Sequence, residues 1–282
     1  MRAADPRIVL GLHRSRYERP LLTGAADLGV EVIDTSFNYL NFRAHEILAR
    51  VASDLLPKFT VSTKVGYFPA SGGSEHSLAP DRLHAAVQQV SRDLGREPDL
   101  VFLHNPEQSL TELPEASAHE RLAHACAVLA DATARGLCGA WGISSWDPRS
   151  LAEPAAHGLP HPDVLMVRAG LLVGVEILAA AELVAARLRP AAVWGMSPFG
   201  GSTEEPVWER FDARVFLRDP QGSNPIQAAF RAACELPVVD AVAVGTNNVN
   251  HLHMLAEALR HKVDDQTLRE YRTLLRARRQ PA

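Results

Sequence analysis

Apolar and polar positions alternate along the chain between two kinds of segment. Short runs rich in β-branched and other apolar residues recur, and longer stretches with apolar residues every three or four positions separate them. The short runs are typical of buried strands, and eight can be placed, at residues 8–13, 30–34, 59–64, 100–104, 139–144, 164–168, 191–196 and 241–244. The longer stretches are typical of amphipathic helices, for example at residues 81–94 and 119–136.

Eight alternations of strand and helix predict an α/β fold with a parallel sheet, and the count of eight favours a (β/α)8 TIM barrel over a doubly wound sheet. Such barrels run to about 250 residues as one domain, so we expect residues 1–282 to form a single domain. Two polar segments, residues 71–77 and 198–212, are expected to be loops after the third and seventh strands. The basic C-terminal segment, residues 270–282, is expected to be a solvated tail.

Composition narrows the kind of partner. The net charge is −4 and charged residues of both signs are scattered, which argues against a nucleic-acid or membrane surface and favours a small-molecule ligand. No apolar run approaches the ~20 residues of a membrane span, and the start of the chain does not resemble a secretory signal. Three widely spaced cysteines suit free thiols in a reducing compartment, so we expect a cytoplasmic protein.

Four of the apolar strand runs end in a residue that can do chemistry. These residues are Asp34, Lys64, His104 and Ser144, and they close four successive strands. In a (β/α)8 barrel the carboxyl ends of the strands share one rim, where active sites of this fold are built. Because side chains alternate along a strand, each of the four can face the mouth of the barrel.

The spacing also predicts how these groups interact. A buried lysine beside a buried aspartate is costly unless the two are paired, so Lys64 and Asp34 are expected to form an ion pair. Tyr39 lies in the turn after the second strand and can fold back over the mouth, where the Lys64 ammonium would lower its pKa from about 10. Such a phenol would serve as a general acid, and His104 would align a substrate oxygen beside it.

Each residue alone has a simpler explanation. A strand-end lysine or aspartate is often a structural salt bridge, a lone histidine is often a core residue, and a loop tyrosine usually packs. The histidines show no HExxH pattern, and His251 and His253 lie on a predicted surface helix, so no metal site is expected. The coincidence of several reactive side chains at successive strand ends is what favours an active site.

At these residues the chain resembles the aldo-keto reductase superfamily, and the similarity extends from about residue 11 to about residue 260. The segments LGVEVIDTSFNY, VSTKVG and LVFLHNPE are the most specific, and LCGAWGISS and WGMSPFGG follow in the order typical of the family. The resemblance implies that Asp34, Tyr39, Lys64 and His104 form a catalytic tetrad. It also implies reduction of an aldehyde or ketone by hydride from NADPH, or alternatively NADH, with Tyr39 as the proton donor.

The same resemblance implies a set of cofactor contacts, several of which depart from the family pattern. Met166 stands where a glutamine usually holds the nicotinamide carboxamide, and Met196 where an aromatic ring usually stacks. His251 and Leu255 replace an arginine and an asparagine that contact the adenosine end. The positions expected to contact cofactor are Ser144, Ser145, Met166, Met196, Ser197, Gly245, Thr246 and Asn247.

Two other functions stay open at the level of sequence. On the same barrel, Lys64 could form a Schiff base in an aldolase, because a desolvated lysine becomes nucleophilic. The altered Met166, Met196 and Leu255 positions also suit a catalytically silent barrel that binds nucleotide as a regulatory or scaffold subunit.

Overall fold

Eight parallel strands close into a barrel in the computed structural model, which describes residues 7–156 and 158–277. The strands follow one another around the barrel in the order of the chain, with β1 pairing both β2 and β10. All eight predicted strands are confirmed, and the predicted barrel with them. The barrel strands are β1 (Arg7–Gly11), β2 (Val32–Asp34), β3 (Thr60–Val65), β6 (Leu100–His104), β7 (Ala140–Ser145), β8 (Val164–Arg168), β9 (Ala192–Met196) and β10 (Ala241–Gly245).

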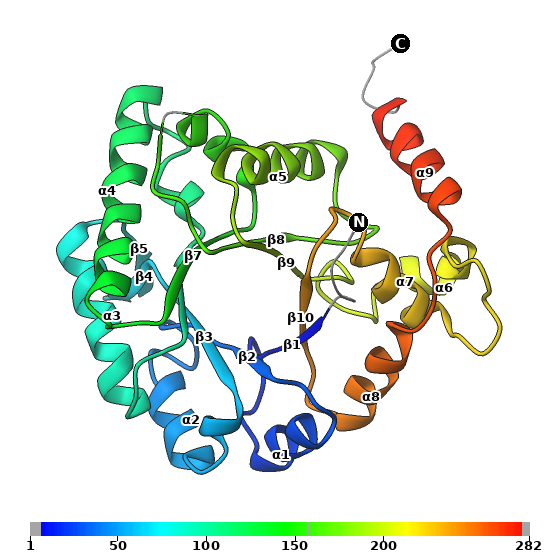
Figure 1. Cartoon of the computed structure of the whole chain (residues 1–282), viewed down its shortest axis with the longest axis horizontal. Helices are drawn as coiled ribbons and strands as arrows, with labels where there is room; N and C mark the ends of the chain where they lie inside the picture. Colours follow the sequence, from blue (N-terminus) through cyan, green and yellow to red (C-terminus); the bar gives the residue numbers. More distant parts are fainter. Residues whose placement is uncertain (1–6, 157, 278–282) are drawn as a thin grey trace.

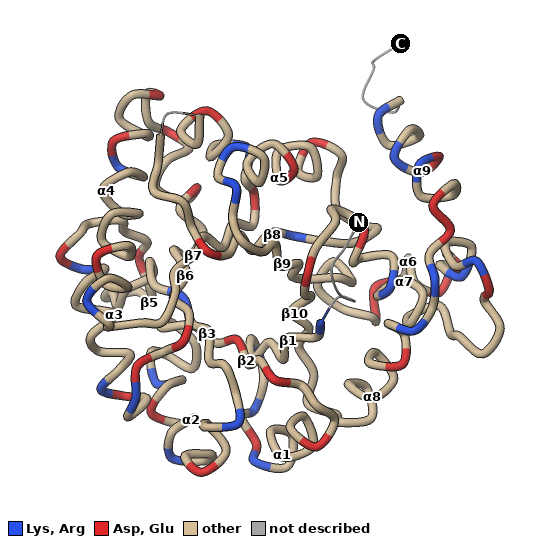
Figure 2. The backbone as a smooth tube through the Cα atoms, in the orientation of Figure 1, with Lys and Arg blue, Asp and Glu red and all other residues tan. Residues whose placement is uncertain are grey.

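Helices surround the barrel as an outer ring (Figure 1). Those predicted at residues 81–94 and 119–136 are present as α3 and α4. Acidic and basic positions are interspersed around the ring (Figure 2), so the charge at the barrel mouth is set by the few charged residues there. The α-helices are α1 (Arg19–Asp27), α2 (Ala44–Ala52), α3 (Pro80–Leu94), α4 (Glu115–Ala134), α5 (Val175–Leu188), α6 (Val207–Arg210), α7 (Pro225–Ala233), α8 (Val249–Ala258) and α9 (Asp265–Ala277).

Strand side chains divide between the barrel interior and the layer beneath the helices. Phe102, Val164 and Met166 belong to an interior cluster, whereas their neighbours Leu103 and Leu165 pack outward against the helices. The interior is filled: a Cβ at Gly142 would lie 2.7 Å from the ring of Phe102. This close packing is why polar side chains of the interior face gather at the carboxyl ends of the strands, above the apolar layer.

The segment after β3 differs from its prediction as a loop. Residues Tyr67–Ala70 (β4) and Gly73–His76 (β5) pair as an antiparallel hairpin with a tight turn. The sequence signal was weak because β4 includes Pro69 and β5 is mostly polar, so neither strand shows apolar alternation. The hairpin matters for the site because its two ends carry Tyr67 and His76.

The C-terminal helix is docked more firmly than expected for a solvated tail. The Tyr271 hydroxyl donates to the Leu171 carbonyl at 2.5 Å, and Arg272 donates to the Glu235 carbonyl at 2.7 Å and pairs with Glu182. The described part of this segment is a helix with no buried residue from 270 on, as expected for a solvated helix, but Tyr271 and Arg272 attach its start to the barrel. Residues 278–282 lie outside the described part of the chain.

The three cysteines are free and buried, as expected from the sequence. In the part of the chain that the structure describes, no helix is long and apolar enough to cross a membrane.

Candidate active site

A cavity of about 580 Å³ opens at the carboxyl ends of the barrel strands. Asp34, Tyr39, Lys64 and His104, the four residues expected to act together, all line it. They come from β2, the loop after it, β3 and β6, which are neighbours in the barrel. Closure of the sheet therefore brings into one pocket residues that are far apart in the sequence.

Lys64 and Asp34 form a buried ion pair. The Lys64 ammonium donates to Asp34 Oδ2 and, at 2.9 Å, to the backbone carbonyl of Thr35. The Ser62 hydroxyl donates to the other Asp34 oxygen at 2.8 Å. Both side chains of the pair are almost fully buried, so these hydrogen bonds offset a desolvation that would otherwise be costly. The predicted pairing is confirmed.

Tyr39 is held over the cavity by the loop that leaves β2. Its amide donates to the Ser36 carbonyl at 3.1 Å, and the three residues that follow it, Leu40, Asn41 and Phe42, all have positive φ. This left-handed backbone reverses the chain so that it can enter α2. The Tyr39 ring lies 5.0 Å from the His13 ring, and the Lys64 ammonium is 5.5 Å from its centroid. The ring thus faces the ion pair.

The expected lowering of the Tyr39 pKa by Lys64 is wrong for this site. Burial raises the pKa of Tyr39, and the negative charge of Asp34 raises it further. The physical reason is that burial of the ring disfavours the phenolate by more than the Lys64 ammonium favours it, since the charge of Lys64 is partly balanced by its partner Asp34. The phenol consequently keeps its proton across the neutral range.

His104 is buried and uncharged. Its Nδ1 is 3.0 Å from the Ser36 hydroxyl oxygen, and the Tyr67 ring packs edge-on against it at 4.9 Å between centroids. Burial lowers the pKa of His104 well below its usual value, and the positive charge of Lys64 acts in the same direction. A neutral imidazole has one donor and one acceptor nitrogen, so the partner at Nδ1 decides what Nε2 presents to the cavity.

Sequence reasoning did not single out three aromatic or imidazole side chains near the site. His13 and Tyr67 line the cavity, and His76 contacts the His104 backbone carbonyl through Nε2 at 2.8 Å. His13 and Tyr67 each stand two residues past a barrel strand end, which is the signal that could have found them, whereas His76 lies at the far end of the hairpin and had no such signal. His13 is the last residue of the first predicted strand run, and Tyr67 follows Lys64 by three positions.

Most of the expected cofactor positions face the same cavity from its other side. Met166, Met196, Ser197, Gly245, Thr246 and Asn247 all line it. Ser144 is buried beside His104 in the strand register.

Ser145 has a different environment from the one expected. It is fully buried and its hydroxyl donates to the Glu107 carboxylate at 2.9 Å. Ser145 follows Ser144 on the strand and therefore points to the opposite face of the sheet. It is thus not among the side chains that face the cavity.

Glu107 fixes the loop after β7. Besides the Ser145 hydroxyl, its carboxylate accepts from the amides of Trp146 at 2.7 Å and Asp147 at 3.0 Å. This places Trp146 at the cavity wall. Burial raises the pKa of Glu107, and these donors act against that rise.

The loop before α8 also lines the cavity. Asn247 Oδ1 accepts from the Arg16 amide at 3.0 Å, which joins this loop to the loop after β1. Thr246 Oγ1 accepts from the Asn248 amide at 3.0 Å. Leu255, which replaces a family asparagine, is buried in the core between helices and cannot reach the cavity.

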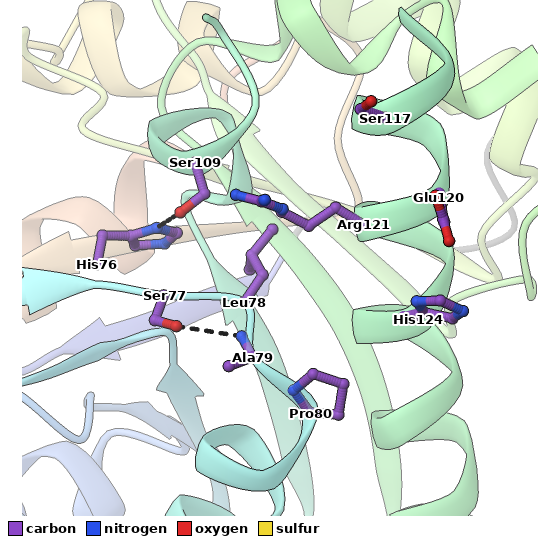
Figure 3. Close-up of a pocket in the computed structure, with 10 residues that line it drawn as sticks. All are labelled: His76, Ser77, Leu78, Ala79, Pro80, Ser109, Ser117, Glu120, Arg121 and His124. Carbon is purple, nitrogen blue, oxygen red and sulfur yellow. Dashed lines mark hydrogen bonds between the residues drawn. The ribbon is translucent and has the colours of Figure 1, made fainter. Parts of the chain in front are cut away.

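A second cavity of about 530 Å³ lies beside the first, between the end of the hairpin, the start of α3 and α4 (Figure 3). His76 links the two cavities, because its Nδ1 is 2.7 Å from the Ser109 hydroxyl while Nε2 contacts the His104 carbonyl. Arg121 reaches into this second cavity from α4 (Figure 3). Within residues 7–156 and 158–277, no three His, Cys, Asp or Glu side chains cluster in a way that could hold a metal ion.

The sequence model of the Aldo/keto reductase family matches residues 14–201, more than half of the chain. The chain therefore belongs to this family. Membership places it among the NAD(P)H-dependent enzymes that act on carbonyl groups. None of the curated proteins matches the chain at a significant level.

Solved structures show the same fold. An aldo-keto reductase from Bacillus halodurans in its holo form is 17% identical, with a TM-score of 0.72 over 95% of this chain and 91% of that one. A Klebsiella pneumoniae aldo-keto reductase in complex with NADPH is 18% identical, with a TM-score of 0.68 over 97% and 92%. A Pseudomonas aeruginosa protein assigned to the aldo-keto reductases is 23% identical, with a TM-score of 0.65 over 91% of both chains. At these identities the likeness concerns the fold.

Proposed function

We propose that this protein reduces an aldehyde or ketone to an alcohol with NADPH as the hydride donor and Tyr39 as the general acid. The observation that carries the proposal is the convergence of Tyr39, His104 and the Asp34–Lys64 pair on one cavity at the barrel mouth. The catalytic role is assigned to these four residues.

The cavity suits a nicotinamide cofactor. It extends from Trp146 and Met166 to the loop of Thr246 and Asn247, and Arg14 adds a positive charge to its wall. Met166 and Met196 would pack against the ring, and the loop before α8 would receive the phosphates near a helix start. When bound, the cofactor supplies the hydride. NADPH is the expected form because relatives of this fold bind it, and NADH is the alternative.

Tyr39 would protonate the carbonyl oxygen. Its raised pKa means that the phenol is fully protonated near neutral pH and therefore always available as a donor. The proton moves as negative charge develops on the substrate oxygen. The nearby Lys64 ammonium then stabilises the phenolate that is left behind.

His104 would hold the same oxygen through Nε2, and Ser36 would set its tautomer. If Ser36 donates its hydroxyl proton to Nδ1, the imidazole proton resides on Nε2, from which it can donate to the substrate. Asn38 Oδ1, at 2.7 Å from the Ser36 hydroxyl, competes for that proton. Ser36 is thus a positioning residue that acts through His104.

Ser36→Ala tests this role. We expect kcat/KM to fall about tenfold, the order of one lost hydrogen bond to a reacting group, while the Kd for NADPH stays the same. The nitrogen NMR shifts of the His104 ring should report a change in tautomer. Unchanged shifts together with unchanged turnover would remove Ser36 from the mechanism.

The geometry argues against an aldolase. A Schiff base requires a neutral amine, whereas Lys64 is held as an ammonium by Asp34 and the Thr35 carbonyl. Borohydride treatment in the presence of carbonyl substrates should leave Lys64 unmodified. A covalent adduct at Lys64 would favour the aldolase.

The decisive experiment measures binding and turnover separately. NADPH and NADH are titrated while tryptophan fluorescence is followed, and a panel of aldehydes and ketones is then assayed for cofactor oxidation and alcohol formation. We expect NADPH to bind and at least one carbonyl class to be reduced. Cofactor binding without turnover of any substrate would favour a silent nucleotide-binding subunit, and no binding would contradict the proposal.

A further inference from the structure

Arg168 occupies an unusual place at the barrel mouth. It is the last residue of β8 and pairs in register with Met196 on β9. Its neighbours Val167 and Ala169 pack into the layers beneath the helices, whereas Met166 lies in the barrel interior. By strand alternation Arg168 shares the face of Met166 and lies one level higher, at the rim.

The guanidinium lacks the partner that a partly buried arginine normally has. Its Nε is buried and has no hydrogen-bond partner, and among the described residues it forms no ion pair. A buried donor without an acceptor is destabilising, and such groups in native proteins call for an explanation. Burial also lowers the pKa of Arg168, although an arginine stays charged at any physiological pH.

The carboxylate that acts on Arg168 through its charge is already paired with another arginine. Asp147 acts on Arg168 through its charge but makes a two-pronged ion pair with Arg149, whose Nε and Nη2 lie 2.8 and 2.5 Å from its oxygens. Arg149 has the more exposed side chain and also reaches Glu176. The Asp147 carboxylate therefore pairs with Arg149 and not with Arg168.

Trp146 fixes the orientation of the guanidinium and connects it to the cavity. The Arg168 guanidinium lies over the Trp146 ring, 4.8 Å from its centroid, and Trp146 itself lines the cavity with 43% of its surface exposed. The contact with the indole restricts the position of the guanidinium, and because Nε is buried, the two Nη groups are the donors that a planar anion can reach.

The charge of the cavity supports an anionic ligand. Of the described residues that line it, Asp34 alone carries a carboxylate, and that charge is balanced by Lys64. Arg14 adds a positive charge at the wall, and burial lowers the pKa of His13, so that ring is neutral near pH 7. Arg168 is not among the residues that line the cavity, but it contacts Trp146, which does, and it adds a further positive charge beside the mouth.

We propose that Arg168 and Trp146 form a binding subsite for the carboxylate of the substrate, which makes the preferred substrate a carbonyl compound that carries an acid group. The two Nη groups of Arg168 would each donate to one carboxylate oxygen, a bidentate geometry in which arginine binds carboxylates. This inference rests on the proposed reductase function, because it names the substrate class of that site.

The experiment compares matched pairs of substrates that differ by the acid. Succinic semialdehyde is paired with butanal, and para-carboxybenzaldehyde with para-methylbenzaldehyde, so that two spacings between carbonyl and acid are sampled. We expect the wild type to prefer the acid of at least one pair. Arg168→Met should lower kcat/KM for that acid about 100-fold, mainly through KM, and change the neutral partner less than threefold.

Two further variants separate charge from geometry. Arg168→Lys keeps the charge but loses the paired donors, and should lie between the wild type and Arg168→Met. Arg210→Met, which removes an exposed positive charge at the end of α6, is the matched control and should leave the preference unchanged. An equal loss with the acid and neutral substrates, or a weaker Kd for NADPH in Arg168→Met, would make Arg168 a cofactor or structural contact and overturn the inference.

A binding measurement keeps the inference testable if no carbonyl compound is reduced. Calorimetric titration with benzoate and with benzamide, in the presence and absence of NADP, requires no turnover. Binding of benzoate that is lost in Arg168→Met and retained in Arg210→Met supports the subsite even if the reductase proposal fails. Equal binding of the two ligands by the wild type, or unchanged benzoate binding by Arg168→Met, contradicts it whether or not the enzyme turns over.

Discussion

The two halves of the barrel mouth are built differently. In the first half, formed by the ends of β2, β3 and β6, the polar groups satisfy one another: Lys64 bonds Asp34, and Ser36 contacts His104. In the second half, formed by the ends of β7 to β10, the wall is Met166, Met196 and Trp146, and the Arg168 Nε has no partner.

The difference shows where each half obtains its specificity. A closed polar network is fixed before any ligand arrives and keeps its geometry, as proton transfer requires. In the second half the methionine side chains are flexible and Arg168 has no ion-pair partner among the described residues, so we expect this half to form its polar contacts when a ligand binds. Substitutions that break the network of the first half should therefore have larger effects than those that alter the wall of the second half.

Lys64→Met should have the largest effect on both stability and activity. It leaves Asp34 buried without its partner, which should lower the free energy of unfolding by about 3–5 kcal/mol, and it should abolish turnover. Denaturant unfolding and steady-state assays measure the two effects. The double variant Lys64→Met/Asp34→Leu removes both charges and should recover stability without recovering activity, and if it stays as unstable as the single variant, the pairing argument is wrong.

Tyr39→Phe should remove the proton donor and little else. We expect kcat to fall by about 10³, within the usual range for loss of a general acid, because the phenyl ring keeps the packing against His13. The Kd for NADPH, followed by fluorescence, should remain within twofold of the wild type. Retention of most of the activity would exclude Tyr39 as the acid.

Lowering the pH should lower the free energy of unfolding through His45, which lies in α2 beneath the first half of the mouth. This residue is buried against β3 with its Nε2 2.7 Å from the Thr63 hydroxyl, and burial lowers its pKa to about 4. Between pH 6.5 and 4 the unfolded chain therefore binds a proton that the folded chain does not, so stability falls as the pH falls through this window. The loss from His45 should total about 3 kcal/mol.

His45→Gln is the matched test of this pH effect. Its amide can still reach the Thr63 hydroxyl but does not titrate. The difference in unfolding free energy between wild type and variant should shift in favour of the variant as the pH is lowered from 7 to 4. Parallel curves over that range would show that His45 is not the source.

Met166→Gln should alter the second half by a small amount. The glutamine restores the residue that usually holds the carboxamide in this family, and one added hydrogen bond should tighten NADPH binding about fivefold. Titration of the variant against the wild type measures the change. Weaker binding of NADPH by the variant would show that the Met166 side chain itself contributes to cofactor binding.

The same division separates what could be predicted from what could not. Asp34, Lys64 and His104 each end an apolar strand run, so periodicity and the geometry of a parallel barrel were enough to bring them together. The hairpin of Tyr67 and His76 was missed because both strands are short, Pro69 interrupts β4 and β5 is mostly polar.

Other features depended on details that periodicity does not carry. The partner of the Ser145 hydroxyl was unpredictable because Glu107 reaches it from a different connection, after β6. The direction of the Tyr39 pKa shift was mispredicted because it depends on how completely Asp34 neutralises Lys64 and how deeply the ring is buried.

The sequence by itself determined the strands, the barrel and the side chains that end each strand, because side-chain alternation and strand order are local properties repeated eight times. Only the tertiary structure decided which polar groups are paired and which are left unpaired. Pairing depends on distances of a few ångströms between segments that are remote in the chain. Asp34, Lys64 and Arg168 all end strand runs in the sequence, but only the structure shows that Lys64 is paired with Asp34 while the Arg168 Nε has no hydrogen-bond partner.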